Sequence, residues 1–353
     1  MKPLRPVPDW PSGTVLRLPH RSRVLAGNPW GDPVERELCV YLPPGYDDAS
    51  GPCTVLWDFA AFTNSGPGHL NWRNHGENLT QRLDRLIGAA TLPPLVIAMP
   101  DCYTSLGGNQ YLNSAGLGRY ADYLLEELIP LLAGQVHVRG DRDGRGAFGK
   151  SSGGYGVLYH AMHYPECWGA VAAHAADCGF DNVYRNALPL ACRTLEAYSG
   201  DVERFLEYFW AARQPDGKDF TTLMVIAMAA SYDPDPEAPR RVRLPFTART
   251  CELLPERWSR WLEHDPLQMV NDAVDALQAM RLIYLDVGQR DQYHIQFGMR
   301  ALADKLEKLG IRHHFEEFDG THSHIDWRLD VSLPMLASAL TAPPQETGGR
   351  SLD

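Results

Sequence analysis

The sequence lacks the features that mark several classes of protein. No stretch approaches the roughly 18 consecutive apolar residues of a membrane span, and the N-terminal residues hold no apolar segment typical of a secretory signal. The seven cysteines form no C-x-x-C pair, which argues against a zinc site or a disulfide framework. A formal net charge of −11 disfavours nucleic acid as a partner. These absences predict a cytoplasmic protein without a membrane, metal or nucleic-acid partner.

Apolar runs and helical stripes alternate along most of the 353 residues. Parallel sheets covered by helices produce this alternation, so the sequence predicts an α/β fold with a mostly parallel, doubly wound sheet. A last helix is predicted over 326–340. The predicted strands are 37–42, 54–59, 95–99, 145–148, 170–173, 281–285 and 314–318.

One region interrupts this rhythm. Residues 178–280 contain no clear strand but many aromatic side chains, Trp210 and Trp258 among them. We expect a helical cap inserted into a core formed by residues 1–177 and 281–340, with an equally weighted alternative in which the insert only packs against the core. The proline- and glycine-containing tail, 341–353, is predicted to be disordered.

The motif Gly149-x-Ser151-x-Gly153 is the pattern of a nucleophile elbow. In an elbow the serine lies on a strained turn between a strand and a helix, and glycines allow the backbone to reverse. Arg145 to Phe148 can form the strand, and the apolar residues after Gly156 lie on one helical face. The context therefore favours Ser151 as a nucleophile.

The residues around Ser151 also match the sequence pattern of a phosphate-binding loop. Gly144-x-x-x-x-Gly149-Lys150-Ser151 satisfies the pattern, and Asp286 ends an apolar run as a magnesium-binding aspartate does. Such a loop follows a buried strand, whereas the residues before Gly144 are mostly charged. A nucleotide-binding ATPase or kinase therefore ranks below the elbow.

Taken together, the motifs resemble an esterase family of the α/β-hydrolases that includes esterase D (S-formylglutathione hydrolase), enterochelin esterases and mycolyltransferases. The resemblance covers most of 30–178 and 281–340, whereas 178–280 match nothing in that family. It implies an α/β-hydrolase fold and no cofactor. The matching segments are the opening strand and turn 40–46, the segment 113–130, the elbow 149–154, Gly288-x-x-Asp291, and Gly320-x-His322 with Trp327.

A serine near neutral pH needs a base, and the base needs an orienting acid. In α/β-hydrolases the chain order is nucleophile, acid, histidine. We therefore assign Asp291 as the acid and His322 as the base, each following a predicted strand. Asp286 stays open as an alternative acid, and His324 as an alternative base.

Acyl transfer also needs hydrogen-bond donors for the developing oxyanion. The backbone N–H of Ser152 is expected to be one, and the resemblance implies Ala60 as the other, or Phe59 if the register differs by one residue. Four side chains are expected to line the substrate pocket: Phe59, Lys150, Trp210 and Trp258.

The sequence thus predicts a serine carboxylesterase that cleaves a small-molecule ester or thioester through an acyl-enzyme. An acyltransferase with the same three residues stays open, and so does a homo-oligomer. A catalytically dead binding module is disfavoured because all three positions are filled.

Overall fold

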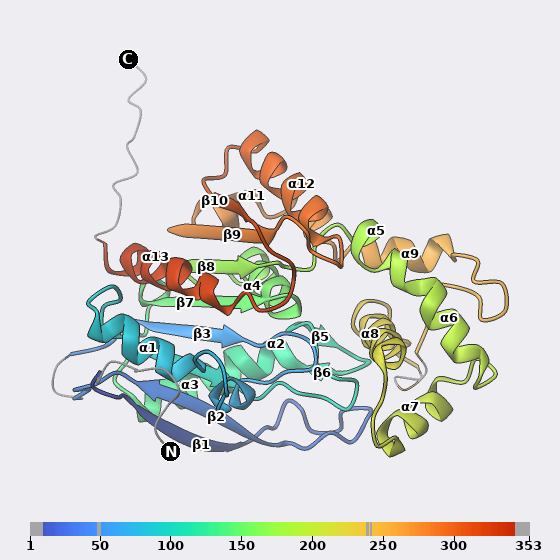
Figure 1. Ribbon diagram of the computed structural model, residues 1–353, viewed down its shortest axis with the longest axis horizontal. Helices are drawn as coiled ribbons and strands as arrows, with labels where there is room; N and C mark the ends of the chain where they lie inside the picture. The colour runs from blue at the N-terminus through green and yellow to red at the C-terminus, as the bar shows by residue number, and fades with distance from the viewer. Residues whose placement is uncertain (1–9, 48–50, 238–239, 241, 343–353) are drawn as a thin grey trace.

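A computed structural model describes residues 10–47, 51–237, 240 and 242–342 (Figure 1). Its main sheet has eight strands in the order β1-β2-β4-β3-β7-β8-β9-β10. The strand β2 pairs antiparallel with β1 and β4, and every other pairing in the sheet is parallel. The predicted mostly parallel sheet is confirmed. The strands are β1 (Thr14–Arg21), β2 (Glu35–Leu42), β3 (Val55–Phe59), β4 (Val96–Pro100), β7 (Arg145–Lys150), β8 (Ala170–His174), β9 (Leu282–Gly288) and β10 (His314–Phe318), with β5 (Asn113–Ser114) and β6 (Gly118–Arg119) forming a separate two-stranded ribbon.

All seven predicted strands are present, with ends that differ by at most three residues. The first strand, Thr14–Arg21, was not predicted from the sequence. It lies at the edge of the sheet and is only partly buried, so its residues form no continuous apolar run. Pro19 within it is also typical of an edge strand rather than a central one.

Helices cover both faces of the sheet. Apolar residues of α1 and α13 pack with Leu56, Phe148 and Tyr284 on one face. Residues of α2, α3, α4 and α12 pack with Trp57 and Ala147 on the other. These helices are α1 (Leu79–Gly88), α2 (Tyr120–Asp122), α3 (Ile129–Gln135), α4 (Ser152–His163), α12 (Ile295–Lys308) and α13 (Leu329–Thr341).

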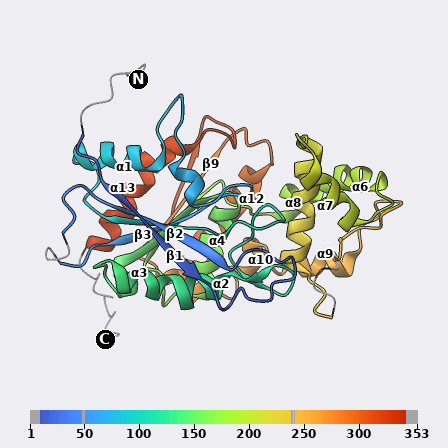
Figure 2. The ribbon, with the colours of Figure 1, turned by 90° about the horizontal axis from the view of Figure 1, so that it is seen from below.

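The secondary structure in the described part of the insert 178–280 consists of helices joined by irregular segments, with one isolated bridge between Phe246 and Leu253. Helices α6 to α9 gather at one side of the molecule in both views (Figures 1 and 2). Its helices are α5 (Phe180–Val183), α6 (Leu188–Glu196), α7 (Val202–Ala211), α8 (Gly217–Tyr232), α9 (Pro255–Leu262), α10 (Pro266–Met269) and α11 (Val274–Gln278).

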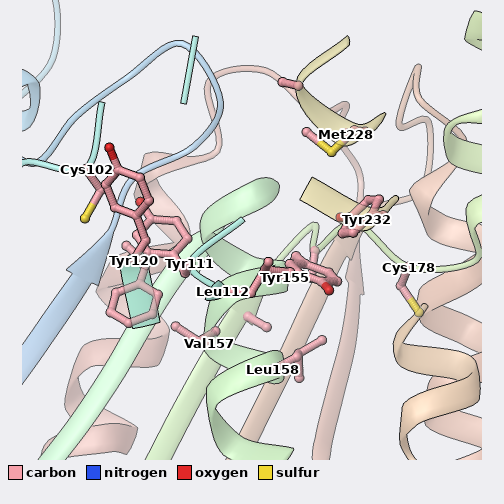
Figure 3. Close-up of a cluster of buried hydrophobic side chains, with 14 of the residues drawn as sticks. Cys102, Tyr111, Leu112, Tyr120, Tyr155, Val157, Leu158, Cys178, Met228 and Tyr232 are labelled. Carbon is pink, nitrogen blue, oxygen red and sulfur yellow. The ribbon is translucent and has the colours of Figure 1, made fainter. Parts of the chain in front are cut away.

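The insert shares the apolar core of the sheet. Tyr232 of α8 lies beside Tyr155 of α4 in Figure 3, with their rings 5.8 Å apart, and Met228 of α8 belongs to the same buried cluster. The last described helix, α13, ends at Thr341, so most of the predicted disordered tail lies outside the described residues. Within the described ranges, no helix is both long and apolar enough to cross a membrane.

Asp286 is fully buried near the C-terminal end of β9 and accepts three hydrogen bonds. The donors are Arg328 Nε at 2.7 Å, His174 Nδ1 at 2.8 Å and the Tyr284 hydroxyl at 3.0 Å. Burial by itself would raise the pKa of Asp286, but His174 and Arg328 lower it below its ordinary value. Arg328 directly precedes α13, so the Asp286 carboxylate ties the start of this helix to β9.

We expect Arg328→Ala to lower the free energy of unfolding by about 3 kcal/mol or more, because it leaves the buried Asp286 carboxylate without its cationic partner. The matched control is Arg290→Ala, which removes an exposed ion pair with Asp319 and is expected to cost less than about 1 kcal/mol. Urea unfolding measures both variants. Equal losses would show that Asp286 does not depend on Arg328.

Candidate active site

Ser151 occupies the strained turn that the elbow motif predicts. Strand β7 ends at Lys150, helix α4 begins at Ser152, and Ser151 between them has φ 56° and ψ −124°. Its backbone N–H donates to the carbonyl of His174 at 2.9 Å, so the turn is tied to the neighbouring strand β8. A positive φ is unfavourable for a residue with a side chain, and such strain is typical of functional positions.

The glycines of the motif are required by close backbone packing. A Cβ on Gly153 would lie 1.8 Å from the carbonyl oxygen of Phe59, and one on Gly149 would lie 2.5 Å from Gly153. Only residues without a side chain allow α4 to approach the end of β3 so closely. The same arrangement does not fit a phosphate-binding loop, because the residues that would form the loop, Arg145–Lys150, are a strand.

His322 is paired with Asp291 after the ends of the neighbouring strands β10 and β9. Its Nδ1 lies 2.8 Å from Asp291 Oδ2, and both side chains are buried. The other carboxylate oxygen of Asp291 accepts the backbone N–H of Tyr293 at 2.9 Å. The Gln292 side chain accepts the backbone N–H of His322 at 3.0 Å. These contacts fix the imidazole and leave its Nε2 for a second partner.

Ser151 and His322 line one cavity of about 400 Å³, called here the serine cavity. The insert forms part of its wall through Val183, Tyr184 and the α8 residues Phe220, Thr221 and Met224. The insert therefore contributes side chains both to the hydrophobic core of the sheet domain and to the wall of the serine cavity.

The family model described as "Putative esterase" matches residues 33–333 of this chain. The chain belongs to this esterase family. The predicted family, fold and enzyme class are confirmed: the protein is a carboxylesterase-type hydrolase with an α/β-hydrolase fold.

Solved structures share this fold at low sequence identity. A ferulic acid esterase is 17% identical with a TM-score of 0.59, over 93% of this chain and 99% of its own. A fluorophosphonate-binding serine hydrolase of Staphylococcus aureus is 16% identical with a TM-score of 0.58, over 92% and 99%. An S-formylglutathione hydrolase of Agrobacterium tumefaciens is 19% identical with a TM-score of 0.54, over 93% and 96%. No curated protein matches the chain.

The two alternatives left open by the sequence take other positions in the esterase. Asp286 is bonded to His174, Tyr284 and Arg328 rather than to His322. His324 is exposed, with φ 57°, and lines a different cavity from the one shared by Ser151 and His322. The geometry thus brings Asp291 and His322 together and leaves the alternatives apart.

The expected oxyanion donors lie at the N-terminus of α4 and directly after β3. Ser152 is the first residue of α4, so its N–H has no partner within the helix. Ala60 directly follows β3 and is buried, and its carbonyl accepts the Tyr111 hydroxyl at 2.7 Å. The neighbouring Ala61 lines the serine cavity.

The four side chains expected in the substrate pocket have different places. Lys150 lines the serine cavity and a second cavity, and Phe59 lines only the second. Trp210 and Trp258 line neither of these cavities: Trp210 is half exposed at the end of α7, and Trp258 is buried with its indole N–H on Asp181 at 3.0 Å. Aromatic content located the insert, but the two tryptophans selected from it do not line the serine cavity, whereas Tyr184 and Phe220 do.

Sequence reasoning missed Asp177. The Ser151 hydroxyl donates to its Oδ1 at 3.3 Å, while the hydroxyls of Ser152 and Tyr184 donate to its Oδ2 at 3.2 and 2.8 Å. Burial raises the pKa of Asp177 although these hydrogen bonds oppose the shift. Its signal in the sequence was its position three residues after a buried strand, the same kind of position from which Asp291 was selected.

Among the described residues, no group of three or more His, Cys, Asp or Glu side chains is arranged to hold a metal ion.

We expect Asp291→Asn to lower kcat about 10⁴-fold while the melting temperature stays close to that of the wild type. An amide in place of the carboxylate leaves the His322 imidazole in the wrong tautomer. Asp286→Asn should give the opposite pattern, with a lower melting temperature but a much smaller loss of kcat per folded molecule. Ester turnover and thermal unfolding of both variants test this, and a larger loss of kcat in Asp286→Asn would transfer the acid role to Asp286.

Proposed function

We propose that this esterase cleaves carboxylic esters or thioesters through an acyl-enzyme formed on Ser151. The observation that carries the proposal is that His322, whose Nδ1 lies 2.8 Å from Asp291, lines the same cavity as the strained Ser151. The nucleophile, the base and the orienting acid each lie just beyond the C-terminal end of a different parallel strand, β7, β10 and β9 respectively.

In the first step the Ser151 oxygen attacks the carbonyl carbon of the ester, and its proton passes to Nε2 of His322. The Asp291 carboxylate, bonded to Nδ1, stabilises the resulting imidazolium. The bond from carbon to the alcohol or thiol then breaks, and that leaving group takes the proton from His322. An ester of Ser151 and a free alcohol or thiol result.

In the second step water attacks the acyl-serine and gives one proton to His322. The carboxylic acid leaves, and His322 returns the proton to Ser151. In both steps the carbonyl oxygen carries negative charge, which the N–H groups of Ser152 and Ala60 are proposed to stabilise.

We expect Ser151→Ala to lower turnover of p-nitrophenyl esters by roughly a million-fold, the scale known for serine nucleophiles. A fluorophosphonate probe should modify Ser151 of the wild type, and peptide mass spectrometry identifies the labelled residue. Ser152→Ala is the control, because it should still be labelled at Ser151. Labelling of Ser152, or no labelling at all, would contradict the proposed nucleophile.

The serine cavity is expected to determine which acyl chains are accepted. Met224→Phe adds volume to its wall, so the preference should shift toward shorter p-nitrophenyl esters, with kcat/KM for the longest chains falling about tenfold. The control is Trp210→Phe, a change outside the cavity that should leave the chain-length profile as it is. A profile unchanged by Met224→Phe would place the acyl chain elsewhere.

A further inference from the structure

A second cavity, of about 540 Å³, adjoins the serine cavity at the nucleophile elbow. Lys150 and Ala61 are the two residues that line both. The second cavity lies on the face of the sheet covered by α1 and α13, and its wall includes Phe148, Leu79 and Leu329 of that face. Its volume falls in the range of small-ligand sites. The proposed reaction assigns no role to it.

Lys150 stands at the end of a row of polar residues that crosses four strands. In the register of the sheet Lys150 is opposite His174, His174 opposite Asp286, and Asp286 opposite Glu316. The other three residues of the row have partners. His174 is bonded to Asp286, and Arg328 is bonded to both Asp286 and Glu316. Lys150 has no hydrogen bond or ion pair among the described residues, although it is half-buried.

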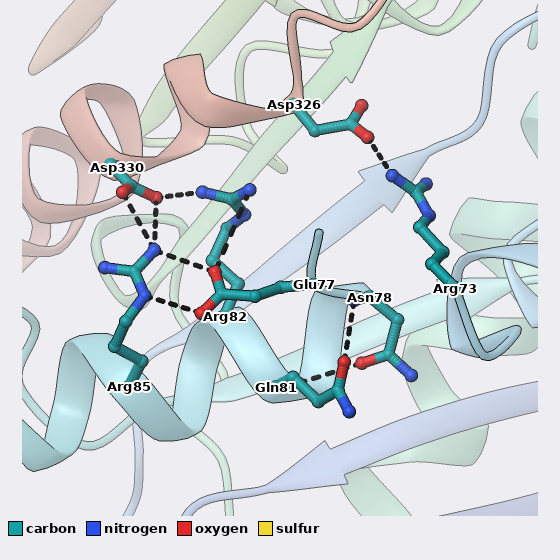
Figure 4. Close-up of polar contacts among 8 residues, drawn as sticks. All are labelled: Arg73, Glu77, Asn78, Gln81, Arg82, Arg85, Asp326 and Asp330. Carbon is teal, nitrogen blue, oxygen red and sulfur yellow. Dashed lines mark hydrogen bonds and ion pairs between the residues drawn. The ribbon is translucent and has the colours of Figure 1, made fainter. Parts of the chain in front are cut away.

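The carboxylates of the second cavity are already paired with basic side chains. Asp58 is bonded to His69, and Asp326 to Arg73. Glu77 accepts hydrogen bonds from Arg85 at 2.7 and 2.9 Å, in the network with Arg82 and Asp330 that Figure 4 shows beside the Arg73–Asp326 pair.

The negative charges of Asp326 and Asp291 raise the pKa of Lys150 without contacting it. Their bonded partners are Arg73 and His322 respectively. Burial is the larger effect and lowers the pKa of Lys150, because partial removal of water destabilises the charged ammonium group when no counter-charge is in contact with it. An anion in the second cavity would supply that counter-charge and remove much of this cost.

We propose that the second cavity is a subsite for an anionic group of the substrate, a carboxylate above all, and that Lys150 is its counter-charge. This inference rests on the proposed function, because it assigns the substrate class of the same site. Lys150 lines both cavities, so an ester bound at the serine can extend an anionic group from one cavity toward the ammonium group in the other. The anion can belong to the acyl part or to the alcohol part of that ester.

Matched pairs of esters distinguish these two sources. For the acyl part, p-nitrophenyl hemiglutarate is compared with p-nitrophenyl pentanoate, which has the same number of acyl carbons and no charge. For the alcohol part, para-acetoxybenzoate is compared with its uncharged methyl ester. The kinetic measurement is the ratio of kcat/KM for the anionic ester to that for the neutral one, in the wild type, Lys150→Met and Lys150→Arg. Lys308→Met is the control for loss of one positive charge at an exposed position.

We expect Lys150→Met to lower this ratio about tenfold in one of the two pairs, since a desolvated ion pair contributes more than an exposed one. Lys150→Arg should keep most of the preference, and Lys308→Met all of it. Added salt should weaken the preference of the wild type. A ratio that Lys150→Met leaves unchanged in both pairs would overturn the proposal.

Binding without turnover separates this inference from the proposed function. Glutarate should raise the melting temperature of Ser151→Ala, and the rise should be absent in the double variant Ser151→Ala/Lys150→Met. If the wild type does not hydrolyse the neutral esters, the proposed function fails, and the glutarate shift alone decides the anion subsite. No shift with Ser151→Ala would then overturn the subsite as well.

Discussion

The close approach of α4 to the end of β3 is the constraint on which the site depends. The backbone of Gly153 faces the carbonyl oxygen of Phe59, where any Cβ would overlap it. This contact places the N-terminus of α4 next to the residues that follow β3, so the N–H groups of Ser152 and Ala60 lie on two adjoining segments. It also leaves Ser151 with a positive φ in the turn between strand and helix. The strain at one residue is therefore the consequence of packing that forms the rest of the site.

Two carboxylates near the end of β9 illustrate how environment separates structural from chemical roles. Asp286 lies within the strand, fully buried, and is held by Arg328, Tyr284 and His174. Asp291 lies beyond the strand and meets His322. Because the first carboxylate is surrounded by donors inside the protein, it stabilises the sheet and α13. The second carboxylate orients an imidazole that faces a cavity.

The insert combines the two interpretations that its aromatic composition left open. The C-terminal half of α8 carries Met228 and Tyr232 into the core, with Tyr232 beside Tyr155, while Phe220 and Met224 in its first turns line the serine cavity. These four residues are spaced four apart and follow one stripe of the helix, so successive turns of the same stripe meet different partners. Substitutions in the core half of α8 will therefore affect stability as well as the shape of the cavity.

The sequence by itself determined the alternation of strands and helices, the elbow at Ser151 and the family, because these depend on local patterns. Continuous apolar runs identified the buried strands, whereas the edge strand with Pro19 lacked such a run and was missed. Tertiary structure decided what depends on contacts between distant segments. It brought His322 to Asp291 rather than Asp286, placed Asp177 beside Ser151, and left Lys150 without a counter-charge among the described residues. The physical reason is that a side chain's role depends on the partners that strand order and register bring within reach, and no local pattern of residues encodes those partners.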